Sequence, residues 1–494
     1  MSGIAPVSDV PVIAFGSPAG PSRHRMSAVA GWFRWRTTPD RIRGMAAVTM
    51  IVAVLLGLIT AVAFTSIAAG LRLIGQQAEP EVLATTDLYF RLNDMDAQVA
   101  NVLLVGGQRG LGIDRQQAQA IYEQDRRQAD QDLLHAAVVA RSEPPVRALL
   151  DDLGRYEALA GEAMYLDGRG PDQPGRPPAA ALVLYRQATD LLRSGILPAA
   201  HALTDQNTAA LDGTYQAKRS TARYDALWVA LAGVGLLAAL VGMQFYFVLR
   251  FRRILNPALV GATVVTLALA AASAAGLAAQ AGHLRVAKAE AFDSIIALSQ
   301  ARAVSDDANA DESRYLVDPA RAGQYQQAFE NRSQQLVQLP GAGIFQYDAA
   351  LAGSLSAYRA NHADVRFGGY FGVEFRNITF AGERAAAEKA LAAYQVYERD
   401  DRHIRALNRG GDLRGAIAFD TSYAPGNSNW AFTQYDNALV ALIAINQRAF
   451  TGAISAGQQD TTGWTGLIPG AAVVLIGILV LAGVRPRLAE YRYR

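Results

Sequence analysis

The sequence predicts an all-α membrane protein with four transmembrane helices and two tandem extracytoplasmic domains that resemble four-helix bundles. Three observations lead to this prediction: four long uncharged apolar stretches, arginines gathered beside their ends, and helical hydrophobic spacing in the long segments between them. The chain has 494 residues, of which 51% are hydrophobic, and its mean hydropathy of +0.09 is high for a wholly soluble protein. The apolar excess is localised, as expected for membrane spans.

The four predicted spans are residues 45–71, 226–249, 258–282 and 464–484. None contains Asp, Glu, Lys or Arg. Each is long enough to cross about 30 Å of hydrocarbon at 1.5 Å per residue. The first is too long for the apolar region of a signal peptide and follows about 44 residues, so we expect it to remain in the protein.

Arginines predict the orientation, because positively charged segments stay on the cytoplasmic side. They cluster before the first span, in the link of residues 250–257 and in the tail of residues 485–494. Both ends are therefore expected in the cytoplasm of a plasma-membrane protein, with residues 72–225 and 283–463 outside. These clusters also suit contacts with anionic lipids.

Residues 1–44 are rich in Pro, Gly, Ser and Ala and are predicted to form a disordered cytoplasmic tail. Trp32, Phe33 and Trp35 lie among arginines near its end. That composition suits the membrane interface or a docking motif for a partner.

Hydrophobic spacing predicts a series of amphipathic helices in each outer region. The first has helical stretches at 71–105, 114–140, 145–165 and 179–224, with a kink expected at Gly195 and Pro198. The second has them at 284–317, 319–336, 347–365, 383–418 and 430–457. Long helices joined by short turns pack as bundles, so we expect one bundle in each region.

Recurring landmarks predict an internal duplication. Asp96-Ala97 resembles Asp307-Ala308, Tyr122 resembles Tyr325, and Leu153 with Tyr156 resembles Leu355 with Tyr358.

An aromatic insert at residues 366–380 distinguishes the second half. Phe371, Val373 and Phe375 alternate, which favours a short hairpin that caps the far tip of the bundle. Exposed aromatics there would suit a partner surface, whereas a lid packed over the bundle is the alternative. Tyr370, Phe371, Phe375 and Trp430 are the predicted partner contacts.

No catalytic, cofactor or metal site is predicted, and the chain is expected not to be an enzyme. The six histidines have no metal-ligand spacing and no cysteine is present; they are His24, His135, His201, His283, His362 and His403. Three acidic pairs are interpreted as solvated helix faces: Asp151-Asp152, Asp306-Asp307 and Asp400-Asp401. Asn377-Ile378-Thr379 matches the glycosylation sequon weakly. No basic stripe suits nucleic acid.

The uncharged spans argue against transport, because carriers usually place ionisable residues or broken helices at the bilayer midplane. The cytoplasmic segments are too short to fold as a kinase, so a signal must pass to a separate protein. A transmembrane receptor or adaptor is therefore favoured. An accessory subunit of an envelope or transporter complex is the second hypothesis, and a pore is the third. The sequence does not decide whether the protein forms a homo-oligomer.

Three segments carry a resemblance to a known family: Tyr185–Ala200 (YRQATDLLRSGILPAA), Thr421–Phe432 (TSYAPGNSNWAF), and Asp436, Ala438 and Leu439 followed by Ile445–Phe450 (INQRAF). With the paired outer regions and four spans, residues 45–485 resemble the actinobacterial GlnX family. The N-terminal tail and the aromatic insert fall outside the matched pattern. Residues 425–429 are expected to form an elbow or a contact site, in which Asn427, Ser428 and Asn429 can cap the next helix.

The resemblance implies partners on both sides of the membrane. Members work with the extracytoplasmic amino-acid-binding lipoprotein GlnH and with the soluble serine/threonine kinase PknG. By resemblance, this chain relays the availability of aspartate, glutamate or glutamine from the solute-binding lipoprotein to the kinase.

Overall fold

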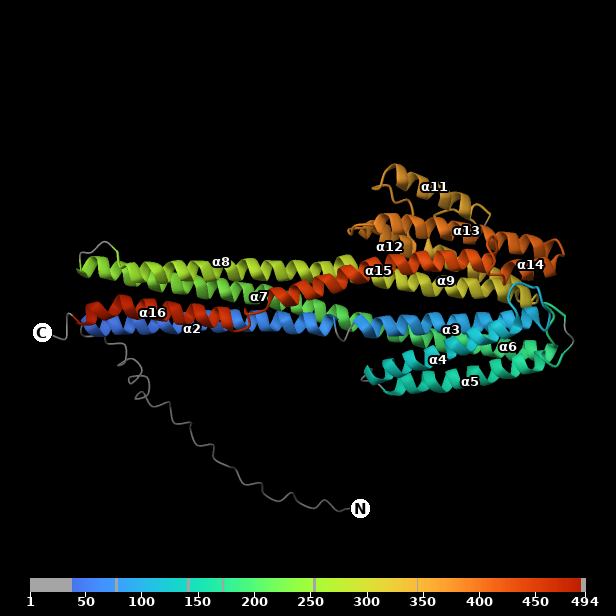
Figure 1. Ribbon diagram of the computed structural model, residues 1–494, viewed down its shortest axis with the longest axis horizontal. Helices are drawn as coiled ribbons and strands as arrows, with labels where there is room; N and C mark the ends of the chain where they lie inside the picture. The colour runs from blue at the N-terminus through green and yellow to red at the C-terminus, as the bar shows by residue number, and fades with distance from the viewer. Residues whose placement is uncertain are drawn as a thin grey trace, which may run out of the picture. The chain divides into compact units, whose positions relative to one another are not determined.

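The computed structural model describes residues 38–75, 79–139, 143–170, 173–251, 255–343 and 345–489 (Figure 1). Their regular structure is helical, apart from an isolated β-bridge between Gln338 and Gly368. The chain divides into two compact units. The larger unit comprises residues 58–230 and 270–469, and the smaller comprises residues up to 57, 231–269 and 470–494. The predicted interfacial motif at Trp32–Trp35 lies outside the described residues.

The helices of the first half follow the predicted order. They are α2 (Thr38–Leu73), α3 (Glu79–Val105), α4 (Arg115–Val139), α5 (Glu143–Asp167), α6 (Ala179–Leu191), the π-helical segment η2 (Leu192–Ile196) and α7 (Leu197–Phe251).

The second half adds two short helices to the predicted ones, α12 and α14. Its elements are α8 (Pro257–Arg285), the π-helical segment η3 (Val286–Phe292), α9 (Asp293–Val317), α10 (Ala322–Leu336), α11 (Tyr347–Ala360), α12 (Gly369–Asn377), α13 (Glu383–Arg409), α14 (Leu413–Asp420), α15 (Ser428–Asp460) and α16 (Leu467–Ala489).

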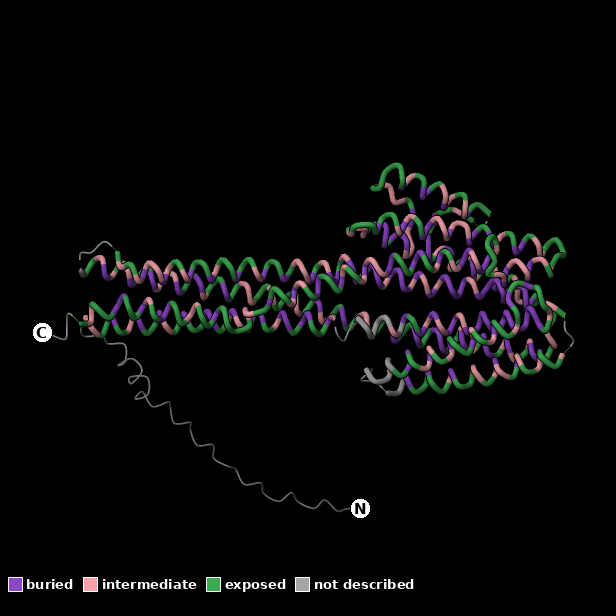
Figure 2. The backbone as a smooth tube through the Cα atoms, viewed as in Figure 1, coloured by how far each residue is buried: buried purple, intermediate pink, exposed green. Residues whose placement is uncertain are grey.

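The smaller unit consists of apolar helical segments from α2, α7, α8 and α16. Many of their large side chains are exposed on its surface, among them Ile51, Leu55, Val234, Val241, Phe245, Val264, Leu267, Val474, Ile478 and Leu481 (Figure 2). A continuous apolar surface of this kind suits hydrocarbon rather than water. The fold is therefore that of an all-α membrane protein.

Five helical stretches are long and apolar enough to cross a membrane in the part of the chain that the structure describes. Four contain the predicted spans, and the fifth is Ser428–Asp460. This helix, α15, packs against α13 and α9 and buries Tyr435, Leu439 and Leu442.

The two outer regions share one hydrophobic core within the larger unit. Helix α3 packs along α4 of its own half and along α9 of the other half. One continuous cluster joins Leu103 and Tyr156 to Leu316 and Ile417. Helices α5 and α11 lie on opposite sides of this core (Figure 1). The two predicted bundles are thus fused side by side.

A close contact between loops joins the halves at the end where α3 and α9 finish. Thr421 Oγ1 donates a hydrogen bond to the Leu111 carbonyl. Gly112 has φ +88°, and a Cβ there would lie 2.5 Å from Thr421 Oγ1 and 2.7 Å from the Ser422 nitrogen. Only glycine combines this left-handed backbone with so close an approach.

The aromatic insert is a helix, not the predicted hairpin. Phe371 and Phe375 are four residues apart, so they share one face of α12, and both are buried, whereas Val373 is exposed. Alternation at positions 371, 373 and 375 had favoured a strand, but the i, i+4 pair fits a helix equally well.

The insert also does not cap the far tip. The Asn377 side-chain amide donates to the carbonyls of Ala289 and Glu290, each at 3.1 Å, and to Ser294 Oγ at 2.9 Å. These atoms belong to η3 and the start of α9, at the opposite end of α9 from the loop contact. The amide of the sequon asparagine is therefore committed to the fold.

π-helical turns interrupt two long helices. In η2, the Leu197 amide donates to the Leu192 carbonyl, five residues back. Pro198 follows directly and has no amide hydrogen to donate, so a widened turn relieves the clash that proline causes in an α-helix. The kink signal at Gly195 and Pro198 thus corresponds to a π-helical turn in a helix that continues.

Candidate functional site

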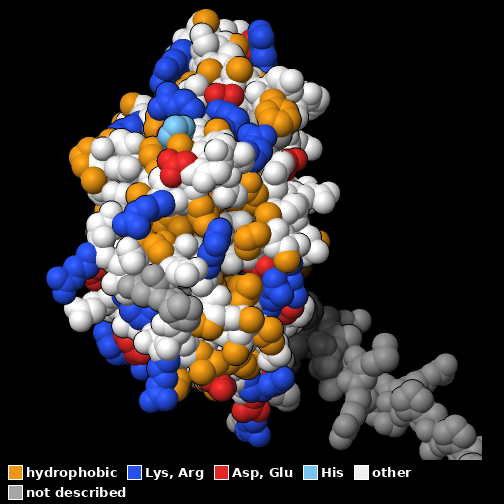
Figure 3. Space-filling model, turned by 90° about the vertical axis from the view of Figure 1, so that its right-hand side faces the viewer, with side chains coloured by type: hydrophobic (Ala, Val, Ile, Leu, Met, Phe, Trp, Pro, Cys, Tyr) orange, Lys and Arg blue, Asp and Glu red, His pale blue; other side chains and the backbone are white. Residues whose placement is uncertain are grey.

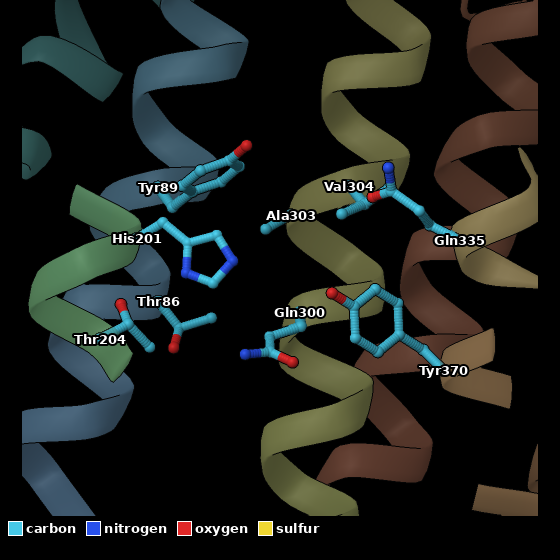
Figure 4. Close-up of a pocket in the computed structure, with 9 residues that line it drawn as sticks. All are labelled: Thr86, Tyr89, His201, Thr204, Gln300, Ala303, Val304, Gln335 and Tyr370. Carbon is cyan, nitrogen blue, oxygen red and sulfur yellow. The ribbon is translucent and has the colours of Figure 1, made fainter. Parts of the chain in front are cut away.

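A pocket lies inside the larger unit between the two halves of the chain. Its cavity volume is about 80 Å³, room for roughly five ordered waters. Figure 4 shows the side chains from α3 and α7 on one side, Gln335 and Tyr370 on the other, and Gln300 between them. The lining residues are Thr86, Tyr89, His201, Thr204, Gln300, Ala303, Val304, Gln335 and Tyr370.

Helical spacing explains why these side chains converge. Thr86 and Tyr89 are three residues apart on α3, as are His201 and Thr204 on α7. Gln300 lies three residues before Ala303 on α9. Residues three or four apart share a helix face, so each long helix contributes one small patch. Tyr370, at the start of α12, closes the far side.

The lining combines polar side chains with apolar surface and carries no Asp, Glu, Lys or Arg. Burial raises the pKa of Tyr89 and of Tyr370, so both phenols remain protonated at neutral pH. The imidazole Nδ1 of His201 lies 3.3 Å from a carboxylate oxygen of Asp205 at the pocket edge. The pocket is therefore suited to hydrogen bonding with neutral groups.

Beside the pocket, a buried ion network joins the two halves. The fully buried guanidinium of Arg314 on α9 donates from Nε to Asp96 on α3 at 2.9 Å. It also donates from Nη1 to Asp307 at 2.8 Å and to Asp311 at 2.9 Å. Arg332 on α10 pairs with both Asp307 and Asp311. Arg314 and Arg332 thus pair with three aspartates, and Arg193, 4.0 Å from Asp311, adds a third positive charge.

In this network the arginines oppose the effect of burial on the pKa of Asp307 and Asp311. Burial alone would raise the pKa of Asp307, but Arg332 and Arg314 lower it below its usual value. Asp96 accepts further hydrogen bonds from Tyr156, Tyr185 and Thr189. Side chains from α3, α5, α6 and α9 therefore meet at one carboxylate.

A second buried cluster has more acids than bases. Glu312, Asp401 and Asp420 share one nearby guanidinium, that of Arg405, which pairs with Asp401 at 2.7 Å. Burial raises the pKa of Asp420 to about 7 and that of Glu312 well above its usual value. The cluster therefore retains protons at neutral pH, because one cation cannot balance three buried anions.

Two of the three acidic pairs had been interpreted wrongly as solvated faces. Asp306, Asp307, Asp400 and Asp401 are all buried, whereas Asp151 is exposed. Asp307 and Asp401 are paired with arginines from their own or neighbouring helices. Sequence spacing alone does not show that a charged helix face lies against another helix.

The four predicted partner contacts have different surroundings. Tyr370 is half-buried and lines the pocket, and Trp430 is half-buried at the start of α15. Phe371 and Phe375 are buried in an aromatic cluster with Tyr394 and so present no exposed surface. The side chains of these two residues pack inside the fold and do not form an exposed aromatic patch.

The segment before α15 is an elbow within the fold. Helix α15 begins at Ser428, and Asn427 precedes it without capping it, because its side chain donates to the Ala424 carbonyl instead. The Ser428 hydroxyl donates to Glu312 at 3.2 Å. The expected side-chain cap is therefore absent at Asn427, and the second acidic cluster holds the elbow.

Arg314 and most of the pocket were not predicted from the sequence. A signal existed for the network, since Asp307, Asp311 and Arg314 follow helical spacing on one face. No comparable signal marked Thr86, Gln300 or Gln335. No group of three His, Cys, Asp or Glu in the described ranges is arranged to hold a metal ion.

The fold is that of a helical membrane protein, and the pocket lies within its larger unit. Residues 70–216, from the end of α2 into α7, match the family model described as the actinobacterial sensor domain. This part of the chain is therefore similar to a sensor domain, which supports a sensing or signalling role. No curated protein and no solved structure matches it.

Proposed function

We propose that this protein is a non-enzymatic transmembrane relay that senses amino-acid availability outside the cell. A solute-binding lipoprotein would present the signal of aspartate, glutamate or glutamine, and a cytoplasmic serine/threonine kinase would receive it. The sensor domain supports a sensing or signalling role. The resemblance in residues 185–200 and 421–450 supports these particular partners.

Helical continuity is the observation that carries the proposal. Residues Ala179–Arg250 form one continuous helical stretch of 72 residues and Pro257–Val317 form another of 61, each with one π-helical turn. Each stretch contains part of the shared core and a predicted span. Stiff helices of this kind can transmit a shift, tilt or rotation from a sensing unit.

The proposed topology has four spans and both ends in the cytoplasm. Helix α15 is the least apolar of the five candidates, and it carries Asp436, which pairs with Arg302 of α9 through two hydrogen bonds. An ion pair to a neighbouring helix of the core suits a helix outside the bilayer. The remaining four spans would place the link of residues 250–257 in the cytoplasm.

The lipoprotein would dock on one face of the larger unit. Figure 3 shows basic, acidic and hydrophobic side chains interspersed on the face that it presents. Such mixed composition is usual for transient interfaces between proteins. The neighbouring end loops are those tied together through Gly112 and Thr421.

The test is capture of partners by the full chain. Tagged protein would be purified from actinobacterial membranes after cross-linking, with and without aspartate, glutamate and glutamine, and co-purifying proteins identified by mass spectrometry. We expect a solute-binding lipoprotein whose recovery changes with amino acids, together with changed phosphorylation of kinase substrates. Recovery of neither under both conditions would refute the relay.

An accessory subunit is the alternative function. The buried network around Arg314 ties the two halves firmly, which suits a static scaffold as well as a relay. Constitutive recovery of a permease, whatever the amino-acid supply, would favour this second role.

A further inference from the structure

The pocket between the halves has the features of a ligand site of its own. Its lining comes from five helices that belong to both halves, α3, α7, α9, α10 and α12. Thr86 and Thr204 are buried at its base, whereas His201 is half-exposed at its edge. It is thus a recess with a way in from solvent.

Charge decides which ligands the pocket can accept. A buried ion without a partner costs several kcal/mol, and no lining residue carries a carboxylate, an ammonium or a guanidinium. Of the charges near the pocket, Asp307 pairs with Arg314 and Arg332, and Asp205 lies 3.3 Å from the His201 imidazole, which is charged only when it is protonated. An ionic ligand would therefore enter unpaired.

The polar groups match a neutral ligand that both donates and accepts hydrogen bonds. The side-chain amides of Gln300 and Gln335 each offer two donors and an acceptor, and the phenols of Tyr89 and Tyr370 can do either. A carboxamide or a set of neighbouring hydroxyls has the same dual character. Ala303 and Val304 supply an apolar wall for the carbon atoms.

We propose that this pocket binds a small uncharged molecule bearing a carboxamide or several hydroxyl groups. Its occupant would contact α3 and α7 of the first half and α9 and α12 of the second at once. Helices α7 and α9 lie in the two continuous stretches that run to the predicted spans, so occupancy would bias their relative position. The inference does not depend on the lipoprotein or the kinase.

Ligand-observed NMR on the full chain in lipid nanodiscs tests the proposal. Propionamide and glycerol serve as neutral probes, and propionate and propylammonium serve as charged counterparts of similar size. We expect saturable binding of at least one neutral probe with a dissociation constant in the millimolar range, as the size of such fragments allows. Binding of neither, or tighter binding of a charged probe, would overturn the proposal.

Two variants connect binding to this pocket. Tyr370→Phe removes one hydroxyl without changing shape and should weaken binding about five- to tenfold. Ala303→Leu fills the cavity and should abolish binding. Tyr165→Phe, which removes the same hydroxyl from an exposed tyrosine on α5, is the matched control and should bind as the wild type does.

Thermal unfolding separates a binding effect from a folding defect. If Ala303→Leu unfolds, Tyr370→Phe alone decides the location of the site. Unchanged affinity in Tyr370→Phe, or an equal loss in Tyr165→Phe, would show that the probes bind elsewhere and would refute the assignment.

Discussion

At the scale of single residues, Arg314 is the charge on which the junction between the halves depends. It is fully buried and binds carboxylates from α3 and α9. Removing one partner from a buried ionic network leaves the others uncompensated, which is far more destabilising than never having built the network.

Arg314→Leu is therefore expected to lower the free energy of unfolding by about 3–5 kcal/mol. Denaturant unfolding of the full chain in detergent measures this change. Arg359→Leu, which breaks an exposed pair with Glu388, is the control and should cost less than about 1 kcal/mol. Equal losses of unfolding free energy in the two variants would show that the buried network contributes no more to stability than an exposed ion pair does.

Glu374 makes the stability of the larger unit depend on pH. It is buried beside Glu383 and Ser294, and burial, reinforced by the Glu383 charge, raises its pKa to about 8. In the unfolded chain the pKa is about 4.3. The folded state thus holds the proton more tightly, so this contribution to stability is complete below about pH 4 and is lost as pH rises through 8.

Glu374→Gln should therefore stabilise the protein by about 1–3 kcal/mol at pH 8.5 and have little effect at pH 5. Unfolding measured at both pH values tests this. Glu162→Gln, an exposed position on α5, should change neither. A variant that is less stable than wild type at pH 8.5 would contradict the expected direction.

At the scale of elements, the contact between the loops at Gly112 and Thr421 fastens the two halves at one end. Gly110 offers a matched comparison, because it also has a positive φ, of +80°, but a Cβ there would meet nothing within 4 Å. The difference between the two sites isolates the cost of the close approach from that of the backbone conformation.

Gly112→Ala should lose about 1–3 kcal/mol more stability than Gly110→Ala, which should lose about 1 kcal/mol. Thermal and denaturant unfolding of both variants give the values. Similar losses of stability in the two variants would mean that the loop at Thr421 can move to accept the added methyl group without destabilising the protein.

The sequence predicted the long helices well because periodic apolar residues specify them locally. The boundaries of α4, α5, α10 and α15 agree with the predicted stretches to within a few residues, and α6 begins where it was predicted. The packing of α3 on α9 was not predictable in this way, since buried Asp96 and Arg314 look like surface residues until the opposite helix is known. The predicted hairpin at residues 366–380 was wrong for a related reason. Phe371 and Phe375 are four residues apart, and residues with that spacing share a face in a strand and also in a helix.

The candidate site was predicted only at Tyr370. Its other lining residues, such as Thr86 and Gln335, are ordinary polar residues on amphipathic helices, and their convergence is a property of the shared core. A pocket formed by five helices has no compact sequence signature.

At the scale of the whole molecule, the proposed topology is open to a direct test because the chain has no cysteine. Glu162→Cys places a thiol on the outer region, and Leu255→Cys places one in the link between the second and third spans. In intact cells, a membrane-impermeant maleimide should label the first variant and spare the second. Labelling of Leu255→Cys before permeabilisation would rule out a cytoplasmic link.

The widened turn at Leu192–Ile196 fixes an angular relation along the molecule. A π-helical turn contains one residue more than an α-helical turn, and one residue corresponds to about 100° of rotation. In a regular α-helix the extra residue would turn every later side chain of α7 by about that angle relative to α6. The widened turn takes up this residue, so His201 and Thr204 still face the pocket.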